Sequence, residues 1–107
     1  MPLEPKNVVL IGAGNVAFHL GKALKRSGNK LLLLINRDAK KAERLGFELG
    51  CQFSTDFKAI PDETDIVIIA VKDDAISEVA AKIFCPGKVV VHTSGSVPMS
   101  ALGYASD

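Results

Sequence analysis

Near the start of the chain, residues 8–17 read Val-Val-Leu-Ile-Gly-Ala-Gly-Asn-Val-Ala. A short apolar run rich in β-branched residues is typical of a buried strand, and the residues after the glycines have helical spacing. The stretch from Gly12 to Ala17 fits the G-x-G-x-x-A pattern in the strand–turn–helix context that this pattern requires. Gly12 allows the tight turn, Gly14 lets a pyrophosphate approach the backbone, and Ala17 keeps the helix close to the sheet.

This turn predicts a dinucleotide site, because the free N–H groups and the positive end of the helix dipole would face the phosphates. The alternative is a tight strand–helix turn with no ligand. We expect cofactor contacts from Gly12, Ala13, Gly14, Asn15 and Val16.

The rest of the chain repeats the alternation of strand and helix. Further apolar runs lie at Leu31–Ile35, Ile66–Val71 and Val89–Val91, and a weaker candidate strand lies at Cys51–Phe53. These runs are continuous rather than alternating, which is typical of parallel strands covered on both faces. The order predicts the α/β class: one Rossmann domain with a doubly wound parallel sheet and strand order 3-2-1-4-5.

Three segments between these runs have helical periodicity, and residues 57–60 are a candidate short helix before Pro61. Asp38 and Gly50 are the expected caps of the second helix, Gly28 is the expected stop of the first, and Asp73 or Asp74 is the expected cap of the third, which Pro86-Gly87 ends. The predicted buried positions are Val16, Leu20, Ala23 and Leu24, then Ala42, Leu45 and Leu49, then Ile76, Val79, Ala80 and Ile83.

The end of the second strand bears on the choice of nicotinamide cofactor. A domain selective for NAD usually has a carboxylate there, which accepts hydrogen bonds from the ribose. Here the sequence has Asn36 and Arg37, and a guanidinium can pair with a 2′-phosphate, to which Lys40 or Lys41 could add a charge. We therefore predict NADP(H) over NAD(H). Two alternatives remain: these cations are a solvated helix start, or Asp38 reaches a ribose hydroxyl.

With these motifs, residues 70–76 (Ala-Val-Lys-Asp-Asp-Ala-Ile) and 92–96 (His-Thr-Ser-Gly-Ser) complete a resemblance. The chain resembles, from Asn7 to about Leu102, the N-terminal domain of an oxidoreductase group. That group includes pyrroline-5-carboxylate reductase, deazaflavin-dependent NADP oxidoreductase and 6-phosphogluconate dehydrogenase. It is most similar to oxidoreductases that join a Rossmann-like domain to a helical domain of unknown function, whose fifth strand ends in a similar stretch.

The resemblance implies roles for individual residues. By similarity to 6-phosphogluconate dehydrogenase, the 2′-phosphate would be held by Asn36, Arg37 and Lys41. Lys72 stands where the family usually has Pro, so the rigidity that Pro would give this loop is not expected. The remaining cofactor contacts implied by the resemblance are Ala70, Val71, Lys72, Thr93, Ser94 and Gly95.

The resemblance also implies a second domain. In related enzymes a mostly helical C-terminal domain supplies substrate contacts and often the dimer interface, so residues 1–107 would be the cofactor domain of a longer protein that forms a homodimer through the other domain. The parent enzyme would transfer hydride between the nicotinamide and a small carbonyl or imine substrate. The alternative is a freestanding, non-catalytic module that senses nucleotides, since fold alone does not separate the two.

His92 would lie at the carboxyl end of its strand, where a proton donor would suit hydride transfer. The Thr-Ser-Gly-Ser stretch after it is also ordinary turn chemistry, and His19 is expected to be a surface or packing residue.

Composition excludes several other classes. The net charge of +1 gives no long-range field for nucleic acid or an anionic membrane, and 48% hydrophobic residues suffice for a core. Cys51 and Cys85 stand far apart without a histidine cluster, so we expect no metal site and buried thiols in a reducing compartment. No apolar run is long enough for a signal peptide or a membrane span, and a cytoplasmic location is the expectation.

Overall fold

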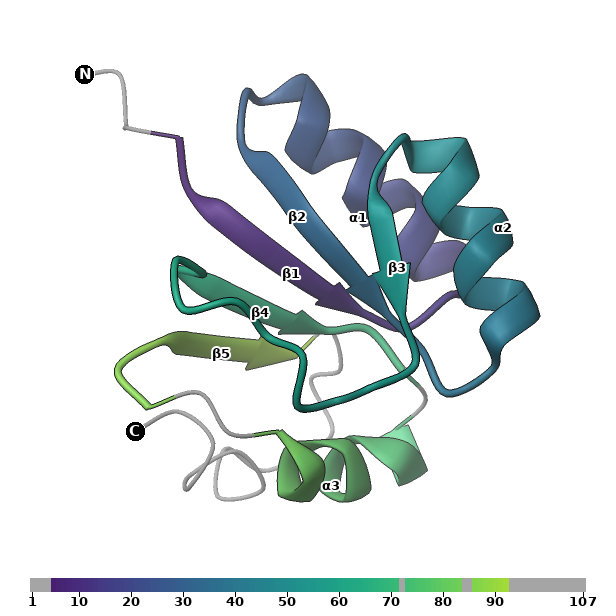
Figure 1. Ribbon diagram of the computed structural model, residues 1–107, viewed down its shortest axis with the longest axis vertical. Helices are drawn as coiled ribbons and strands as arrows, with labels where there is room; N and C mark the ends of the chain where they lie inside the picture. Colours follow the sequence, from purple (N-terminus) through teal and green to yellow (C-terminus); the bar gives the residue numbers. More distant parts are fainter. Residues whose placement is uncertain (1–4, 72, 84–85, 93–107) are drawn as a thin grey trace.

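The computed structural model describes residues 5–71, 73–83 and 86–92. Strands and helices alternate along this part of the chain (Figure 1), apart from the direct succession of the third and fourth strands. The strands are β1 (Asn7–Ile11), β2 (Lys30–Ile35), β3 (Gln52–Ser54), β4 (Ile66–Ile69) and β5 (Val89–His92). The helices are α1 (Asn15–Arg26), α2 (Ala39–Leu49) and α3 (Asp73–Lys82).

All five strands belong to one parallel sheet in the order β3-β2-β1-β4-β5. The doubly wound prediction and its strand order are therefore confirmed. β1 is central, and the chain reverses its direction of progress across the sheet between β3 and β4. In such sheets ligands bind beyond the carboxyl ends of the strands at this reversal, which here lies after Ile11.

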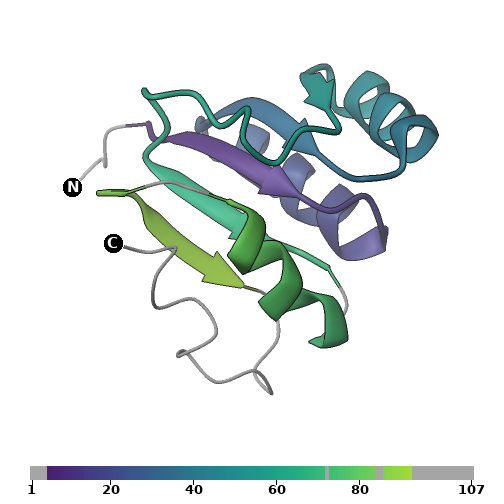
Figure 2. The same cartoon turned by 60° about the horizontal axis from the view of Figure 1, so that its bottom comes forward.

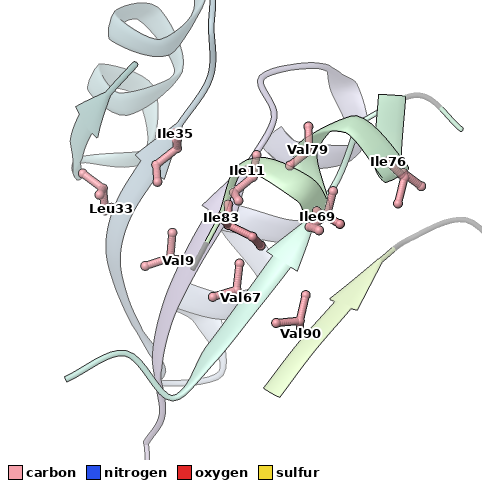
Figure 3. Packing of buried hydrophobic residues seen from close by; sticks show 11 residues of the cluster. Val9, Ile11, Leu33, Ile35, Val67, Ile69, Ile76, Val79, Ile83 and Val90 are labelled. Atoms are coloured by element: carbon pink, nitrogen blue, oxygen red, sulfur yellow. The ribbon is translucent and has the colours of Figure 1, made fainter. Parts of the chain in front are cut away.

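Helices cover both faces of the sheet, with α1 and α2 on one side and α3 on the other (Figures 1 and 2). Side chains of successive strand residues point to opposite faces. Val9 and Ile11 consequently join the cluster beneath α3, together with Val67 and Ile69 (Figure 3), while Leu10 belongs to the cluster beneath α1 and α2. β1 is thus apolar on both faces, which explains why its sequence does not alternate.

The inward face of α1 differs from the prediction. Ala17 and Gly21 are its buried residues, whereas Val16 is 53% exposed and Ala23 is also exposed. A Cβ atom on Gly21 would lie 2.5 Å from a methyl carbon of Leu49 on α2. The two helices therefore approach each other so closely that a small residue is needed at this position, which apolar periodicity does not reveal.

The helix ends agree with the prediction for α1 and α2, and the start of α3 differs. Asp38 accepts hydrogen bonds from the backbone N–H groups of Lys40 and Lys41, and Gly50 ends α2 with φ 67°. α3 begins at Asp73, so both predicted cap residues lie within its first turn.

Gly28 stops α1 as predicted: it directly follows the C-cap residue Ser27, has φ 89°, and donates its N–H to the carbonyl of Lys25 over 3.1 Å. The predicted short helix is corrected. Residues 57–60 form a turn instead of a helix: Asp56 accepts the backbone N–H of Lys58 with its side chain, which favours a turn over continued helix.

Candidate cofactor site

A cleft of about 1200 Å³ opens at the carboxyl ends of β1, β2 and β4, where the topology predicts a ligand site. It brings together ten of the predicted cofactor contacts from four separate segments. These residues are Gly12, Ala13, Gly14, Asn15, Val16, Asn36, Arg37, Lys41, Ala70 and Val71.

Gly12 makes the tight turn out of β1. Its φ of 129° is a conformation that L side chains rarely adopt, and its N–H donates to the carbonyl of Ile35 over 2.9 Å. A Cβ atom here would lie 2.3 Å from the carbonyl oxygen of Ala70. The backbones at the ends of β1, β2 and β4 therefore meet too closely for any side chain at this position.

At Gly14, in contrast, a side chain would extend into open space. A Cβ atom there would have no protein atom within 4 Å, and Gly14 has φ −90° and ψ −167°, which most residues can adopt. Packing thus does not require glycine at this position. The space that a side chain would enter belongs to the cleft, which fits a group that must approach the backbone closely.

The N-terminus of α1 is suited to an anion. Its N-cap residue, Gly14, has no side chain that could accept a first-turn N–H, and the first turn has no acidic residue. The N-terminus of α2 is different, because Asp38 already satisfies two of its N–H groups over 3.0 and 3.2 Å. Helix N-termini carry free N–H groups and a partial positive charge, so α1 offers the better phosphate cradle.

One wall of the cleft is mainly basic, with three cationic side chains beside the carboxylates of Asp38 and Glu48. Arg37 and Lys41 line it as predicted, and so does Arg44, which sequence reasoning missed although it follows Lys41 at a spacing of i, i+3 on the same helix. Lys40 does not line the cleft. The Asn36 side-chain amide donates to the carbonyl of Asp38 over 3.3 Å, which ties the end of β2 to the start of α2.

α3 forms the opposite wall, which sequence reasoning also missed. Its cleft-lining residues are Ala75, Glu78, Val79 and Lys82. The Glu78 carboxylate lies 3.0 Å from Lys82 Nζ and 3.7 Å from a guanidinium nitrogen of Arg37. The hydrogen bond from Lys82 lowers the pKa of Glu78, and the positive charges of Lys82 and Arg37 lower it further. An ion pair therefore spans the cleft from the basic wall to α3.

The remaining predicted site residues lie away from the cleft or outside the described residues. His92 ends β5 beside Ile69 and is half-buried, and among the described residues it is not one that lines the cleft. Thr93, Ser94, Gly95 and Lys72 lie outside the described residues, as does Ser96.

Other sequence-based expectations can be compared in the part of the chain that the structure describes. His19 is exposed and stacks edge-on against Phe18 at 5.4 Å. Cys51 is a half-buried free thiol and Cys85 is not described. The described residues contain no cluster that could hold a metal ion, and no described helix is long and apolar enough to cross a membrane.

Solved structures share this fold. A Bacteroides fragilis protein described as a candidate NADP oxidoreductase is 35% identical, with a TM-score of 0.77 over 91% of this chain and 39% of that one. Prephenate dehydrogenase from Aquifex aeolicus, solved with hydroxyphenyl propionate and NAD+, has a TM-score of 0.78 at 21% identity, over 98% of this chain and 41% of its own.

Curated relatives match over shorter stretches. Glutamyl-tRNA reductase from Methanocaldococcus jannaschii is 52% identical over 48 residues, which is 45% of this chain and 12% of that protein. Pyrroline-5-carboxylate reductase from Aquifex aeolicus is 26% identical over 76 residues, 71% of this chain and 29% of the enzyme. The chain thus spans less than a third of either curated relative.

The resemblance predicted from the sequence is confirmed by these matches and by one that covers most of the chain. Residues 7–95 match the family described as NADP oxidoreductase, coenzyme F420-dependent. This chain accordingly belongs to that family of pyridine-nucleotide-binding oxidoreductases.

Proposed function

We propose that this chain is the NADP(H)-binding domain of an oxidoreductase that transfers hydride between the nicotinamide and a small carbonyl or imine substrate. The observation that carries the cofactor choice is the end of β2, where the uncharged Asn36 and the cationic Arg37 line the cleft. A free acid at this point would favour the ribose hydroxyls of NAD(H).

The chemistry of the cleft supports a dinucleotide. The pyrophosphate would lie on the first-turn N–H groups of α1, in the open space beside Gly14. A 2′-phosphate would reach Arg37 and Lys41 on the basic wall. When bound, the nicotinamide supplies the hydride chemistry, and the chain supplies binding, orientation and electrostatics.

Asp38 does not serve the ribose in this proposal. Its carboxylate accepts two backbone N–H groups of α2, and loss of such an N-cap interaction costs about 1 kcal/mol. Both bonds are accepted by Oδ1, so Oδ2 could still accept a ribose hydroxyl at the cleft, which Asp38 also lines. We favour a 2′-phosphate on Arg37 because the uncharged Asn36 stands after β2 where an NAD-selective domain usually has an acid.

The substrate would be bound between this domain and a second one. Clefts between domains are a common location for such pockets, and the chain spans about two-fifths of the solved structures that it resembles. We propose that a C-terminal domain supplies the substrate contacts and a dimer interface. Ser94 and Gly95 would lie near the nicotinamide, and His92 is the candidate proton donor.

Calorimetric titration with NADPH and NADH tests the cofactor choice. A charge-assisted hydrogen bond contributes about 1.5–3 kcal/mol, so we expect NADPH to bind roughly 10- to 150-fold more tightly. Arg37→Ala should remove most of this preference. Lys40→Ala is the matched control, because Lys40 carries the same charge in the same segment and does not line the cleft. Equal or tighter NADH binding would refute the proposal, as would an unchanged ratio in Arg37→Ala.

A further inference from the structure

Glu78 occupies an unusual place in the cleft. It lies on α3, yet its carboxylate is 3.7 Å from Arg37, the residue proposed to hold the 2′-phosphate. Both side chains are more than half exposed, so each can exchange this partner for another. The Glu78 carboxylate therefore places a negative charge of the protein where the 2′-phosphate of the cofactor would bind.

We infer that Glu78 is a specificity-determining residue that weakens the preference for NADP(H) by competing with the 2′-phosphate for Arg37. This inference rests on the proposed cofactor function. In the absence of cofactor, Arg37 pairs with Glu78 across the cleft. Binding of NADP(H) replaces that carboxylate with a phosphate at the same guanidinium, while NAD(H) has no group that would displace it.

Lys82 keeps the carboxylate in place. Its ammonium group donates to the Glu78 carboxylate over 3.0 Å from the next turn of α3, and it also lies 5.6 Å from the centre of the Phe57 ring. Glu78 is therefore held at the cleft by a partner on its own helix. When Arg37 turns to the phosphate, the Glu78 carboxylate stays near the new anion, with Lys82 as its remaining partner.

The effect of Glu78 on the affinity for NADP(H) can be calculated. A phosphate bound to the same guanidinium would lie roughly 7 Å from the carboxylate, given ordinary charge-assisted hydrogen-bond lengths. Repulsion between a carboxylate and a phosphate of nearly two charges at this distance in water corresponds to about a three- to tenfold change in affinity. An exposed ion pair contributes little to folding, so the same carboxylate can be neutralised with little effect on the fold.

The variant Glu78→Gln keeps the shape and removes the charge. We expect the ratio of NADH to NADPH dissociation constants to rise about three- to tenfold, because NADPH binds more tightly and NADH does not. Glu43→Gln is the matched control: Glu43 is exposed on α2 and does not line the cleft, so the same change in net charge should leave the ratio within twofold. Thermal melting of each variant verifies that the fold is kept.

Two further measurements test whether the change in the ratio depends on Arg37 and on charge. In an Arg37→Ala background Glu78→Gln should change the ratio by clearly less, because the guanidinium that holds the phosphate beside the carboxylate is gone and their repulsion falls as they separate. The effect should also shrink at 1 M salt, where the Debye length is about 3 Å. A gain of equal size in the Arg37→Ala background, or at 1 M salt, would overturn the inference.

The direction in which Glu78→Gln changes the NADH to NADPH ratio shows whether Glu78 competes with the phosphate or positions Arg37 for it. If Glu78 instead positions Arg37 for the phosphate, Glu78→Gln will lower the preference for NADPH, and the inference is wrong. If the unaltered chain shows no preference but Glu78→Gln acquires one, the proposed NADP(H) preference fails while the inference stands. If neither protein discriminates, Arg37 does not meet the 2′-phosphate and the inference fails as well.

Discussion

Gly12→Ala tests whether three strand ends meet as closely as the structure shows. The added Cβ atom would lie 2.3 Å from the carbonyl oxygen of Ala70, and the residue would have to adopt a φ of 129°. Backbone strain of this kind costs about 1–3 kcal/mol. Overpacking against a well-packed interior costs about 1–3 kcal/mol more, and a backbone oxygen yields less readily than a side chain.

The sum, about 2–6 kcal/mol, is a large part of the 5–15 kcal/mol typical of a domain's stability. For a domain near this size each kcal/mol lowers Tm by about 4–8 °C, so we expect a loss of roughly 10–50 °C. Circular dichroism during heating measures it. Gly14→Ala is the matched control, because its Cβ atom meets nothing within 4 Å. If Gly12→Ala melts within about 4 °C of Gly14→Ala, the close approach of the strand ends is refuted.

Three more predictions concern the site and its surroundings. Gly14→Val should fold but lose dinucleotide binding, because its methyl groups would enter the open space proposed for the pyrophosphate; calorimetry on a variant with an unchanged circular dichroism spectrum decides this. Burial raises the pKa of the Cys51 thiol, and the positive charge of Lys25 only partly offsets this. At pH 8 a smaller fraction of Cys51 should therefore be thiolate in the native protein than in urea, and the native thiol should react more slowly with iodoacetamide, which peptide mass mapping measures. Residues 1–107 should bind cofactor without turning over imines, keto acids or aldehydes, because a site open to water neither orients a substrate nor excludes solvent; sustained NADPH loss in an absorbance assay would contradict this.

The topology and one wall of the site could be predicted from the sequence because their signals are local. Gly12 to Ala17 identify the turn, and continuous apolar runs identify covered parallel strands. Arg37 could be singled out because the end of the second strand is a known position for cofactor selection.

The opposite wall could not be predicted in this way. Glu78 contacts Arg37 only because β2 and β4 both flank β1, and nothing near Glu78 in the sequence indicates that. The prediction of the inward face of α1 was wrong for a related reason. Apolar spacing selects large side chains such as Val16, whereas the close approach to α2 requires a small residue at Gly21. Ala17 lies inward, as the glycine motif predicts.

The central position of β1 has a consequence for the order in which the molecule can assemble. β1 can pair with β2 as soon as both are synthesised, but its other neighbour, β4, comes much later in the chain. The backbone N–H of Asn7 donates to the Asp65 side chain across 58 positions. At about 5–20 residues per second, the roughly 50 residues from the end of β2 to the end of α3 take about 2–10 s to emerge from the ribosome. During that time Val9 and Ile11 lack their cover on the α3 side. A nascent chain would therefore expose the strand that is most buried in the folded domain to chaperones before it can form the cleft.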